Sequence, residues 1–121
     1  MLVVDDDRDH AQTLADLLAL MGHEAAFATD AASALPMARD FQPDIVFLDL
    51  SMPQIDGYTL ARTIRATPEL EKIGIVAVSG HGDPEDHVRS RQAGFDAHVT
   101  KPADVPLIEA ILEQLKSGTR R

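Results

Sequence analysis

Short apolar runs that alternate with longer segments of helical spacing constrain the fold of this chain more than any other feature. Residues 45–48 and 73–78 are almost continuously apolar, which is typical of central parallel strands that are covered on both faces. Weaker runs of similar length occupy residues 2–5, 24–28 and 97–99. Strict alternation of strands and helices predicts an α/β fold with a parallel sheet and right-handed crossovers. For such a chain we expect the flavodoxin-like, doubly wound (βα)5 sheet with strand order 2-1-3-4-5.

Apolar residues at helical spacing predict a helix after each strand. The expected helices occupy residues 11–21, 32–41, 57–65, 84–93 and 104–116. Gly22 is a suitable C-terminal stop for the first helix, and Asp83 with Pro84 forms a suitable start for the fourth. Pro36 lies inside the second helix, where its missing backbone donor should kink the helix or shift its start.

The size and composition of the chain exclude several classes of protein. A length of 121 residues fits one domain, which we expect to span residues 1–116, with 117–121 as a tail or the start of a linker. A net charge of -9 disfavours binding to nucleic acid, and the absence of cysteine excludes disulfides and thiolate metal sites. No apolar run approaches the ~20 residues that span a membrane. We therefore expect a cytoplasmic domain with no nucleic-acid or membrane partner.

Carboxylates end two of the predicted strands. The apolar run at residues 2–4 stops at Asp5 and Asp6, and the run at 45–48 stops at Asp49. In the expected strand order these two strands are neighbours at the switch point of the sheet, where ligands bind at the carboxyl ends. The sequence therefore predicts an acidic pocket at this edge.

Such a pocket favours a divalent cation, because carboxylates close together repel one another. Oxygen ligands without neighbouring His or Cys suit Mg²⁺, with Mn²⁺ as the alternative, and Mg²⁺ leaves one carboxylate free to act as a nucleophile. Lys101, just past the last strand, would lie beside the pocket and pair with a phosphoryl oxygen. Ser79, at the end of another strand, offers a hydroxyl there. These are the parts that phosphoryl transfer requires.

Four motifs at these positions carry a family resemblance. They are Val4-Asp5-Asp6-Asp7, Asp49-Leu50-Ser51-Met52-Pro53 with Asp56-Gly57, Ser79-Gly80 and Lys101-Pro102. In this order and at these strand ends, they make the chain resemble a receiver domain of two-component response regulators over nearly its full length. The resemblance implies that Asp49 accepts a phosphoryl group from the phosphohistidine of a histidine kinase or of a histidine phosphotransfer protein.

The resemblance also implies roles for the other residues of the pocket. Mg²⁺ would bind Asp6, Asp49 and the main-chain carbonyl of Ser51, and Asp5 would hold a metal-bound water. Ser79 would bond to the phosphoryl group and Lys101 would form an ion pair with it. The domain would then be a switch rather than an enzyme, although it assists its own phosphorylation and dephosphorylation. Phosphorylation would shift the face made by the helix at 84–93, the strand at 97–99 and the helix at 104–116.

Three further residues are candidates for tuning this switch. Ser51 lies two residues after Asp49, and His81 two residues after Ser79; in the family these positions flank the phosphoryl group and tune its lifetime. His98 stands where many receivers carry a Tyr or Phe that swings inward, and the burial of an imidazole would depend on its charge. No short His-x₃-His spacing links the histidines, so no metal site is expected among them: His10, His23, His81, His87 and His98.

Several of these residues also have a purely structural interpretation. Asp7 is best interpreted as the N-cap of the first helix, and Asp56-Gly57 as a turn into the third. Ser79 as an ordinary turn serine is a close alternative. For Lys101, only its place before a proline, just after the last strand, argues against a plain surface lysine.

Two other functions compete with the phosphoacceptor switch. The first is a Mg²⁺-dependent phosphohydrolase with an aspartyl nucleophile, as in haloacid-dehalogenase-like enzymes. Those enzymes use a second aspartate two residues after the nucleophile, where this chain has Ser51. The second is a receiver-like module that docks partners without being phosphorylated, which the complete set of pocket residues disfavours. A flavin-binding flavodoxin is disfavoured because no Ser/Thr/Gly-rich phosphate loop follows the first strand.

The ends of the chain suggest its context. Leu2 already belongs to the first predicted strand, so we expect that Met1 was added to an excised domain or that a few native residues are missing. Residues 94–104 resemble the corresponding segment of receivers attached to hybrid histidine kinases. The receiver module of such a kinase is therefore one interpretation of the chain, and a free-standing receiver domain is the alternative. Its output partner is undetermined.

Overall fold

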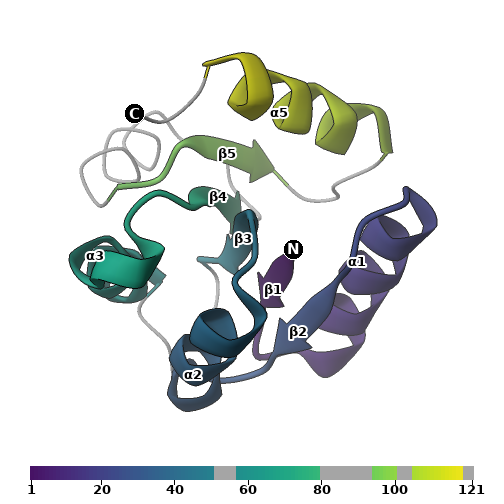
Figure 1. The fold of residues 1–121 in the computed structure, drawn as a ribbon. Coiled ribbons are helices and arrows are strands. Elements are labelled where there is room, and N and C mark those ends of the chain that lie inside the picture. The colour runs from purple at the N-terminus through teal and green to yellow at the C-terminus, as the bar shows by residue number, and fades with distance from the viewer. Residues whose placement is uncertain (51–56, 80–93, 101–104, 119–121) are drawn as a thin grey trace.

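The computed structural model describes residues 1–50, 57–79, 94–100 and 105–118. Its strands form one parallel sheet in the order β2-β1-β3-β4-β5, and the helices pack on its two faces (Figure 1). The elements are β1 (Leu2–Val4), α1 (Arg8–Leu20), β2 (Ala26–Ala28), α2 (Ala31–Phe41), β3 (Ile45–Asp49), α3 (Gly57–Ala66), the 3₁₀ helix η1 (Pro68–Leu70), β4 (Gly74–Ser79), β5 (Ala97–Thr100) and α5 (Val105–Gly118). The predicted α/β class, parallel sheet and strand order are confirmed. The helix expected at residues 84–93 lies outside the described residues.

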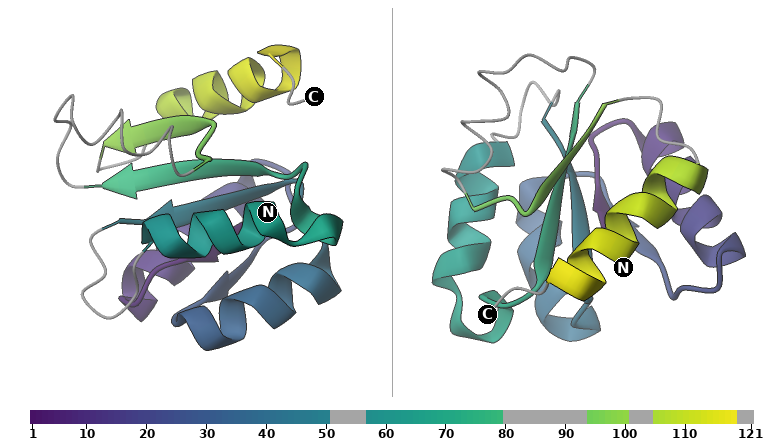
Figure 2. Two further views of the ribbon diagram at one scale, coloured as in Figure 1. Left: turned by 90° about the vertical axis from the view of Figure 1, so that its left-hand side faces the viewer. Right: turned by 90° about the horizontal axis from the view of Figure 1, so that it is seen from above.

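Side chains that alternate along the strands divide the core into two layers. Leu48 and Ala77 pack with α2 and α3, whereas Phe47, Val76 and Val78 pack with α1 and α5. The views in Figure 2 show the same division, with α1 and α5 on one face of the sheet and α2 and α3 on the other. Because both faces are covered, the central strands β3 and β4 are apolar at nearly every position, which explains their continuous hydrophobic runs.

Polar caps start the helices earlier than their apolar spacing indicates. Asp7 is the N-cap of α1 and accepts hydrogen bonds from the N–H groups of Asp9 and His10 at 3.0 and 3.3 Å, which confirms its structural interpretation. The helix therefore begins at Arg8 rather than at Ala11. The exposed residues between the cap and Ala11 carry no apolar signal, so periodicity alone could not include them.

The second helix runs through its proline. Asp30 caps α2 by accepting the N–H of Ser33 at 2.7 Å, and the helix extends from Ala31 to Phe41 with Pro36 inside it. The start of the helix is therefore not shifted toward Pro36, because the cap determines where the first turn begins. Pro36 is exposed.

The other boundaries differ from prediction by a few residues. The strand expected at 24–28 is shortened to Ala26–Ala28, and the strand expected at 45–48 extends to Asp49. Gly22 follows the end of α1 with a φ of 97°, the left-handed conformation typical of a helix stop. The last helix ends at Gly118, inside the segment expected as a tail. Within the described ranges, no helix is long and apolar enough to cross a membrane.

Candidate functional site

Two buried carboxylates lie side by side at the carboxyl edge of the sheet. Val4 of β1 pairs with Leu48 of β3, so the residues that follow them, Asp5 and Asp49, are neighbours. Asp5 is 5% exposed and Asp49 4% exposed. The sequence places both acids directly after apolar strand residues, and the crossover through α1 and α2 brings the two strand ends together (Figure 1).

The backbone around Asp5 is anchored on two sides. Its main-chain N–H donates to the carbonyl of Ala28 at 3.1 Å, and its Oδ1 accepts the N–H of Asp7 at 2.9 Å. Asp7 in turn caps α1. The first carboxylate of the pocket is therefore held by the same short turn that starts the first helix.

Asp6 differs from the other two acids because its side chain is exposed. Among the described residues, no group of three or more His, Cys, Asp or Glu side chains is arranged to hold a metal ion. The described part of the pocket is thus a buried pair with a third acid at the surface beside it. Mg²⁺ typically takes only one or two carboxylates and completes its shell with carbonyl groups and waters, so these oxygen donors fit that ion.

Burial makes it unfavourable for both carboxylates of this pair to carry a negative charge. Two negative charges at adjacent buried positions repel each other and lose hydration, and each effect disfavours the doubly ionised state. A divalent cation offsets both effects. The arrangement therefore supports a cation-dependent site, in which Asp49 is the buried last residue of the central strand β3.

The start of α3 packs directly against the phosphoacceptor candidate. A Cβ atom added to Gly57 would lie 2.8 Å from Cδ2 of Leu50 and 3.5 Å from the main-chain oxygen of Asp49. Leu50 itself donates its N–H to the carbonyl of Val78 at 2.8 Å, just beyond the end of β3. Gly57 was predicted as the end of a turn and the start of the third helix, and α3 does begin there. Its lack of a side chain lets the helix approach Leu50 and the main chain of Asp49 closely.

On the other side of Asp49, the structure brings Ser79 and His98 together. Asp49 lies beside Val78 of the neighbouring strand β4, and Ser79 is the residue that follows Val78. Ser79 is 6% exposed, and its Oγ lies 2.7 Å from Nε2 of the half-buried His98. Ser79 is therefore a buried, hydrogen-bonded strand residue rather than a solvent-exposed turn serine.

The remaining predicted positions divide into two groups. His10 is exposed and lies beside the carboxylate of Asp7, with Nδ1 3.4 Å from Oδ2. The other predicted positions lie outside the described residues: Ser51, Asp56, His81, Asp83, His87 and Lys101. Their predicted roles stay predictions.

Comparison with known proteins decides the family. Residues 1–113 match the response regulator receiver domain family. The chain is a response regulator receiver domain. It therefore belongs to a family of signalling switches of two-component systems, whose members generally bind Mg²⁺ at an acidic phosphorylation site.

Individual relatives agree with this assignment. The polar-differentiation response regulator DivK of Brucella anthropi is 28% identical over 117 residues, which cover 97% of this chain and 93% of that protein. The signal receiver domain of a signal transduction histidine kinase from Syntrophus aciditrophicus is 30% identical, with a TM-score of 0.82. The match covers 99% of this chain and 91% of that structure. The chemotaxis protein CheY4 of Vibrio cholerae shares the fold at 23% identity, with a TM-score of 0.87. The match covers 93% of this chain and 94% of that structure.

The receiver domain also contains a buried ion pair at the opposite ends of the strands, where β4 and β5 begin. The guanidinium of Arg65 lies 2.7 Å from Oδ2 of Asp96 and donates to the carbonyls of Gly94 at 3.0 Å and Ile73 at 2.5 Å. These bonds tie the end of α3 to the residues that precede β4 and β5. Sequence reasoning placed Arg65 on the helix but missed this role; a charged residue next to the apolar stripe was the available signal.

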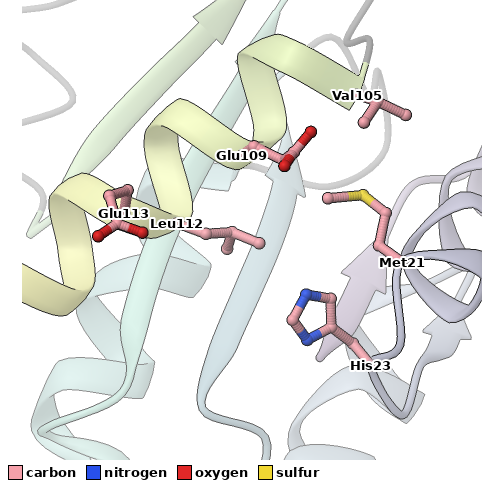
Figure 3. A pocket seen from close by; sticks show the side chains of 6 residues that line it. All are labelled: Met21, His23, Val105, Glu109, Leu112 and Glu113. Carbon is pink, nitrogen blue, oxygen red and sulfur yellow. The ribbon is translucent and has the colours of Figure 1, made fainter.

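A separate hollow of the receiver domain lies between the end of α1 and α5 (Figure 3). Its lining residues are Met21, His23, Val105, Glu109, Leu112 and Glu113. Among the described residues that line it, none is a predicted site residue. The hollow is therefore distinct from the acidic pocket at the carboxyl edge.

Proposed function

We propose that Asp49 is the phosphoacceptor of this receiver domain and that its donor is the phosphohistidine of a histidine kinase or of a histidine phosphotransfer protein. A carboxylate oxygen of Asp49 attacks phosphorus, and the bond between phosphorus and the donor imidazole breaks. The imidazole nitrogen keeps the electron pair and takes up a proton. The observation that carries the proposal is the buried pair of Asp49 and Asp5 at the end of the central strands.

Mg²⁺ is the proposed cofactor, with Mn²⁺ as a substitute. Asp5, Asp6, Asp49 and the main-chain carbonyl of Ser51 would hold it, and when bound it would neutralise charge on the phosphoryl oxygens. The oxygen-only donor set supports this choice. The role of Asp5 is also supported by its burial and by the turn that fixes its Oδ1 next to the N–H of Asp7.

Ser79 and Lys101 are the proposed partners of the phosphoryl group once it is on Asp49. Ser79 would donate a hydrogen bond to a phosphoryl oxygen, and its buried place on the strand next to β3 supports this role. Lys101 would form an ion pair with the same group. Ser51, His81 and His98 are the proposed tuning residues, of which His98 already contacts Ser79.

The output is proposed to be a change of surface. Phosphorylation would draw Ser79 and its loop toward Asp49 and shift the face formed by residues 84–93, β5 and α5 between two states that a partner distinguishes. We take residues 1–116 as the receiver unit and 117–121 as its tail or linker. That the unit serves in a hybrid histidine kinase, and in the cytoplasm, stays a prediction.

Intact-mass analysis tests the phosphoacceptor directly. The chain is incubated with Mg²⁺ and a small phosphodonor such as acetyl phosphate, and we expect one added phosphoryl group. Asp49→Asn should abolish the label, and EDTA should suppress it. Asp44→Asn is the matched control, because Asp44 is an exposed acid just before the same strand. Equal labelling of the wild type and Asp49→Asn would refute the proposal, and sustained turnover of the phosphodonor would favour a phosphohydrolase.

A further inference from the structure

The contact between Ser79 and His98 can exist in two forms. Oγ of Ser79 and Nε2 of His98 are 2.7 Å apart, which is a hydrogen-bond distance for either direction of donation. With hydrogen on Nδ1, Nε2 accepts the hydroxyl proton of Ser79. With hydrogen on Nε2, the imidazole donates and Oγ accepts. The two forms have the same heavy-atom positions and differ only in where the hydrogens lie.

The strand register places this contact next to the phosphoacceptor. Asp49 of β3 pairs with Val78 of β4, and Ser79 pairs with Thr100 of β5. Ser79 follows Val78, so it stands between the strand that carries Asp49 and the strand that carries His98. Its side chain shares a face of the sheet with Ala77, because side chains alternate along a strand.

His98 lies on this same face. Its neighbours in sequence, Ala97 and Val99, pack in the opposite core layer with α1 and α5, so the imidazole points to the α3 side of the sheet. It pairs in register with Ala77 and reaches from there to Ser79. Any influence of His98 on the phosphoryl group through this contact passes by way of Ser79, which makes His98 a positioning residue.

A serine hydroxyl has one hydrogen to donate, and this creates a conflict. Phosphoryl oxygens act here as acceptors, so Ser79 must donate its hydrogen to bind them. When the hydroxyl donates to Nε2 of His98, that hydrogen is not available to the phosphoryl group. Either the contact breaks on phosphorylation, or its direction reverses.

We infer that phosphorylation of Asp49 reverses the Ser79–His98 hydrogen bond, so that His98 donates from Nε2 and Ser79 donates to the phosphoryl group. The inference rests on the proposed role of Asp49. Both forms fit the same 2.7 Å separation, so the contact is kept in the reversed direction when His98 follows the proposed movement of Ser79 toward Asp49. The hydrogen on Nδ1 passes to water and Nε2 takes another from water, or Nε2 gains a proton and the imidazole becomes cationic. Both routes leave hydrogen on Nε2.

Electrostatics favours this direction. The phosphoryl group adds negative charge on the β3 side of Ser79, and negative charge favours hydrogen on the imidazole nitrogen that points toward it. The charges described on neighbouring elements include the buried acids Asp5 and Asp49. They also include the ion pair of Arg65 with Asp96, whose two charges neutralise each other just before β5. Mg²⁺ and Lys101 would offset part of the new charge at Asp49, and the part that remains is the change that His98 would experience.

Nitrogen NMR of the imidazole rings tests the inference. Long-range ¹H–¹⁵N correlation spectra of the ¹⁵N-labelled chain show which ring nitrogen of each histidine carries hydrogen. They are recorded with Mg²⁺ alone and with Mg²⁺ plus beryllium fluoride, which mimics a phosphoryl group on a carboxylate. We expect Nε2 of His98 to change from an acceptor to a donor resonance only with beryllium fluoride. His23, which lines the separate hollow, is the internal control and should not respond.

Two outcomes overturn the inference and are separable from failure of the proposed function. The amide signals of Leu50 and Gly57, next to Asp49, report whether beryllium fluoride binds. If they shift while Nε2 of His98 stays an acceptor, or was a donor from the start, the reversal is wrong and the phosphoacceptor stands. If they do not shift, the phosphoacceptor proposal fails and this inference fails with it.

Ser79→Ala gives the second arm of the test. This variant removes the hydroxyl through which His98 would sense the phosphoryl group. Because Ser79 is itself a proposed ligand of the phosphoryl group, the variant should bind beryllium fluoride more weakly, and the reagent is raised until the amide signals of Leu50 and Gly57 reach a full shift. At that saturation we expect the response of Nε2 to be lost. A full response of His98 in Ser79→Ala would show that the imidazole senses the site independently of Ser79 and would overturn the inference.

Discussion

The carboxylate of Asp96 lies 2.7 Å from the guanidinium of Arg65, and both side chains are largely buried, with 9% and 14% of their surface exposed. Oδ2 of Asp96 also accepts the main-chain N–H of Ile75 at 2.9 Å. This ion pair joins α3, β4 and β5 at the edge of the sheet opposite Asp49. Because His98 follows two residues after Asp96, the pair also fixes the strand from which His98 reaches Ser79.

Removing one partner of this ion pair should destabilise the domain strongly. Arg65→Met leaves Asp96 buried without its cation and deprives the carbonyls of Gly94 and Ile73 of a donor. Loss of one partner of a buried pair typically costs about 3–5 kcal/mol, to be measured by urea unfolding. Arg39→Met is the matched control, because the Arg39–Glu69 pair is exposed and 3.7 Å apart; its loss should cost at most about 1 kcal/mol. Equal costs for the two variants would contradict the structural role of Arg65.

A side chain at Gly57 should disturb both stability and phosphorylation. Gly57→Val places a branched group where a Cβ atom alone would approach Cδ2 of Leu50 to 2.8 Å. Because the 2.8 Å contact is with the end of the Leu50 side chain, which can shift, we expect a cost near the lower limit of the about 1–3 kcal/mol that overpacking typically causes. Because Leu50 follows Asp49 directly, we also expect slower labelling by acetyl phosphate. Ala66→Val, at an exposed position at the end of the same helix, should change unfolding by only a few tenths of a kcal/mol and leave labelling unchanged.

Neutralising Asp5 should have opposite effects with and without metal. Asp5→Asn keeps an oxygen for the N–H of Asp7 but removes one of two adjacent buried charges. Without Mg²⁺ we expect a free energy of unfolding equal to or above that of the wild type, because repulsion with Asp49 is lost. Mg²⁺ should stabilise the variant less than the wild type, since ligand stabilisation follows affinity.

Thermal unfolding with EDTA and across a Mg²⁺ titration measures both effects. We expect the variant to bind Mg²⁺ at least tenfold more weakly, which corresponds to about 1.4 kcal/mol. Asp9→Asn is the control, as an exposed acid in the first turn of α1. Equal Mg²⁺ stabilisation of Asp5→Asn and the wild type would argue against Asp5 as part of the metal site.

The cap of α2 should make part of the stability depend on pH. The hydroxyl of Ser33, and then its main-chain N–H, donate to Asp30 and hold the pKa of that carboxyl below its usual range. A pKa that is lower in the folded state contributes stability that is present above the unfolded value and is lost as pH falls through the folded value. Asp30→Ala should therefore lower the urea midpoint at pH 7. The difference in urea midpoint between the variant and the wild type should become smaller as the pH falls.

Ser33→Ala separates the two hydrogen bonds to this carboxyl. It removes the hydroxyl donor but keeps the main-chain N–H, so the pKa of Asp30 should return part of the way toward its usual value. We expect a pH dependence of unfolding between those of the wild type and Asp30→Ala. A wild-type profile in Ser33→Ala would mean that the hydroxyl does not perturb Asp30.

Local sequence patterns were sufficient for much of this fold. Continuous apolar runs such as the one ending at Asp49 mark strands that are buried on both faces, and such runs can be recognised from the local sequence alone. The alternation of strands and helices then predicted the strand order, which the sheet confirms. Boundaries were less certain, because caps such as Asp7 and Asp30 start a helix through main-chain hydrogen bonds that leave no periodic signal.

The candidate site could be predicted as a set of residues but not as a geometry. Carboxylates at the ends of two strands, in the order of the family motifs, were enough to nominate Asp5, Asp6 and Asp49. Their unequal burial could not be predicted in this way: Asp5 and Asp49 are buried, whereas Asp6 is exposed. Exposure depends on which side of the chain a residue faces after the strand ends, and no local pattern determines that.

The sequence by itself determined the fold class, the strand order and the acids at the carboxyl edge, because these follow from periodicity and chain connectivity. Only the tertiary structure decided the contacts between residues distant in the chain. Arg65 meets Asp96, and Ser79 meets His98, because parallel strands and a packed helix bring these side chains into register. Such pairs are selected by the three-dimensional arrangement of the sheet, and neither partner carries a local signal that names the other.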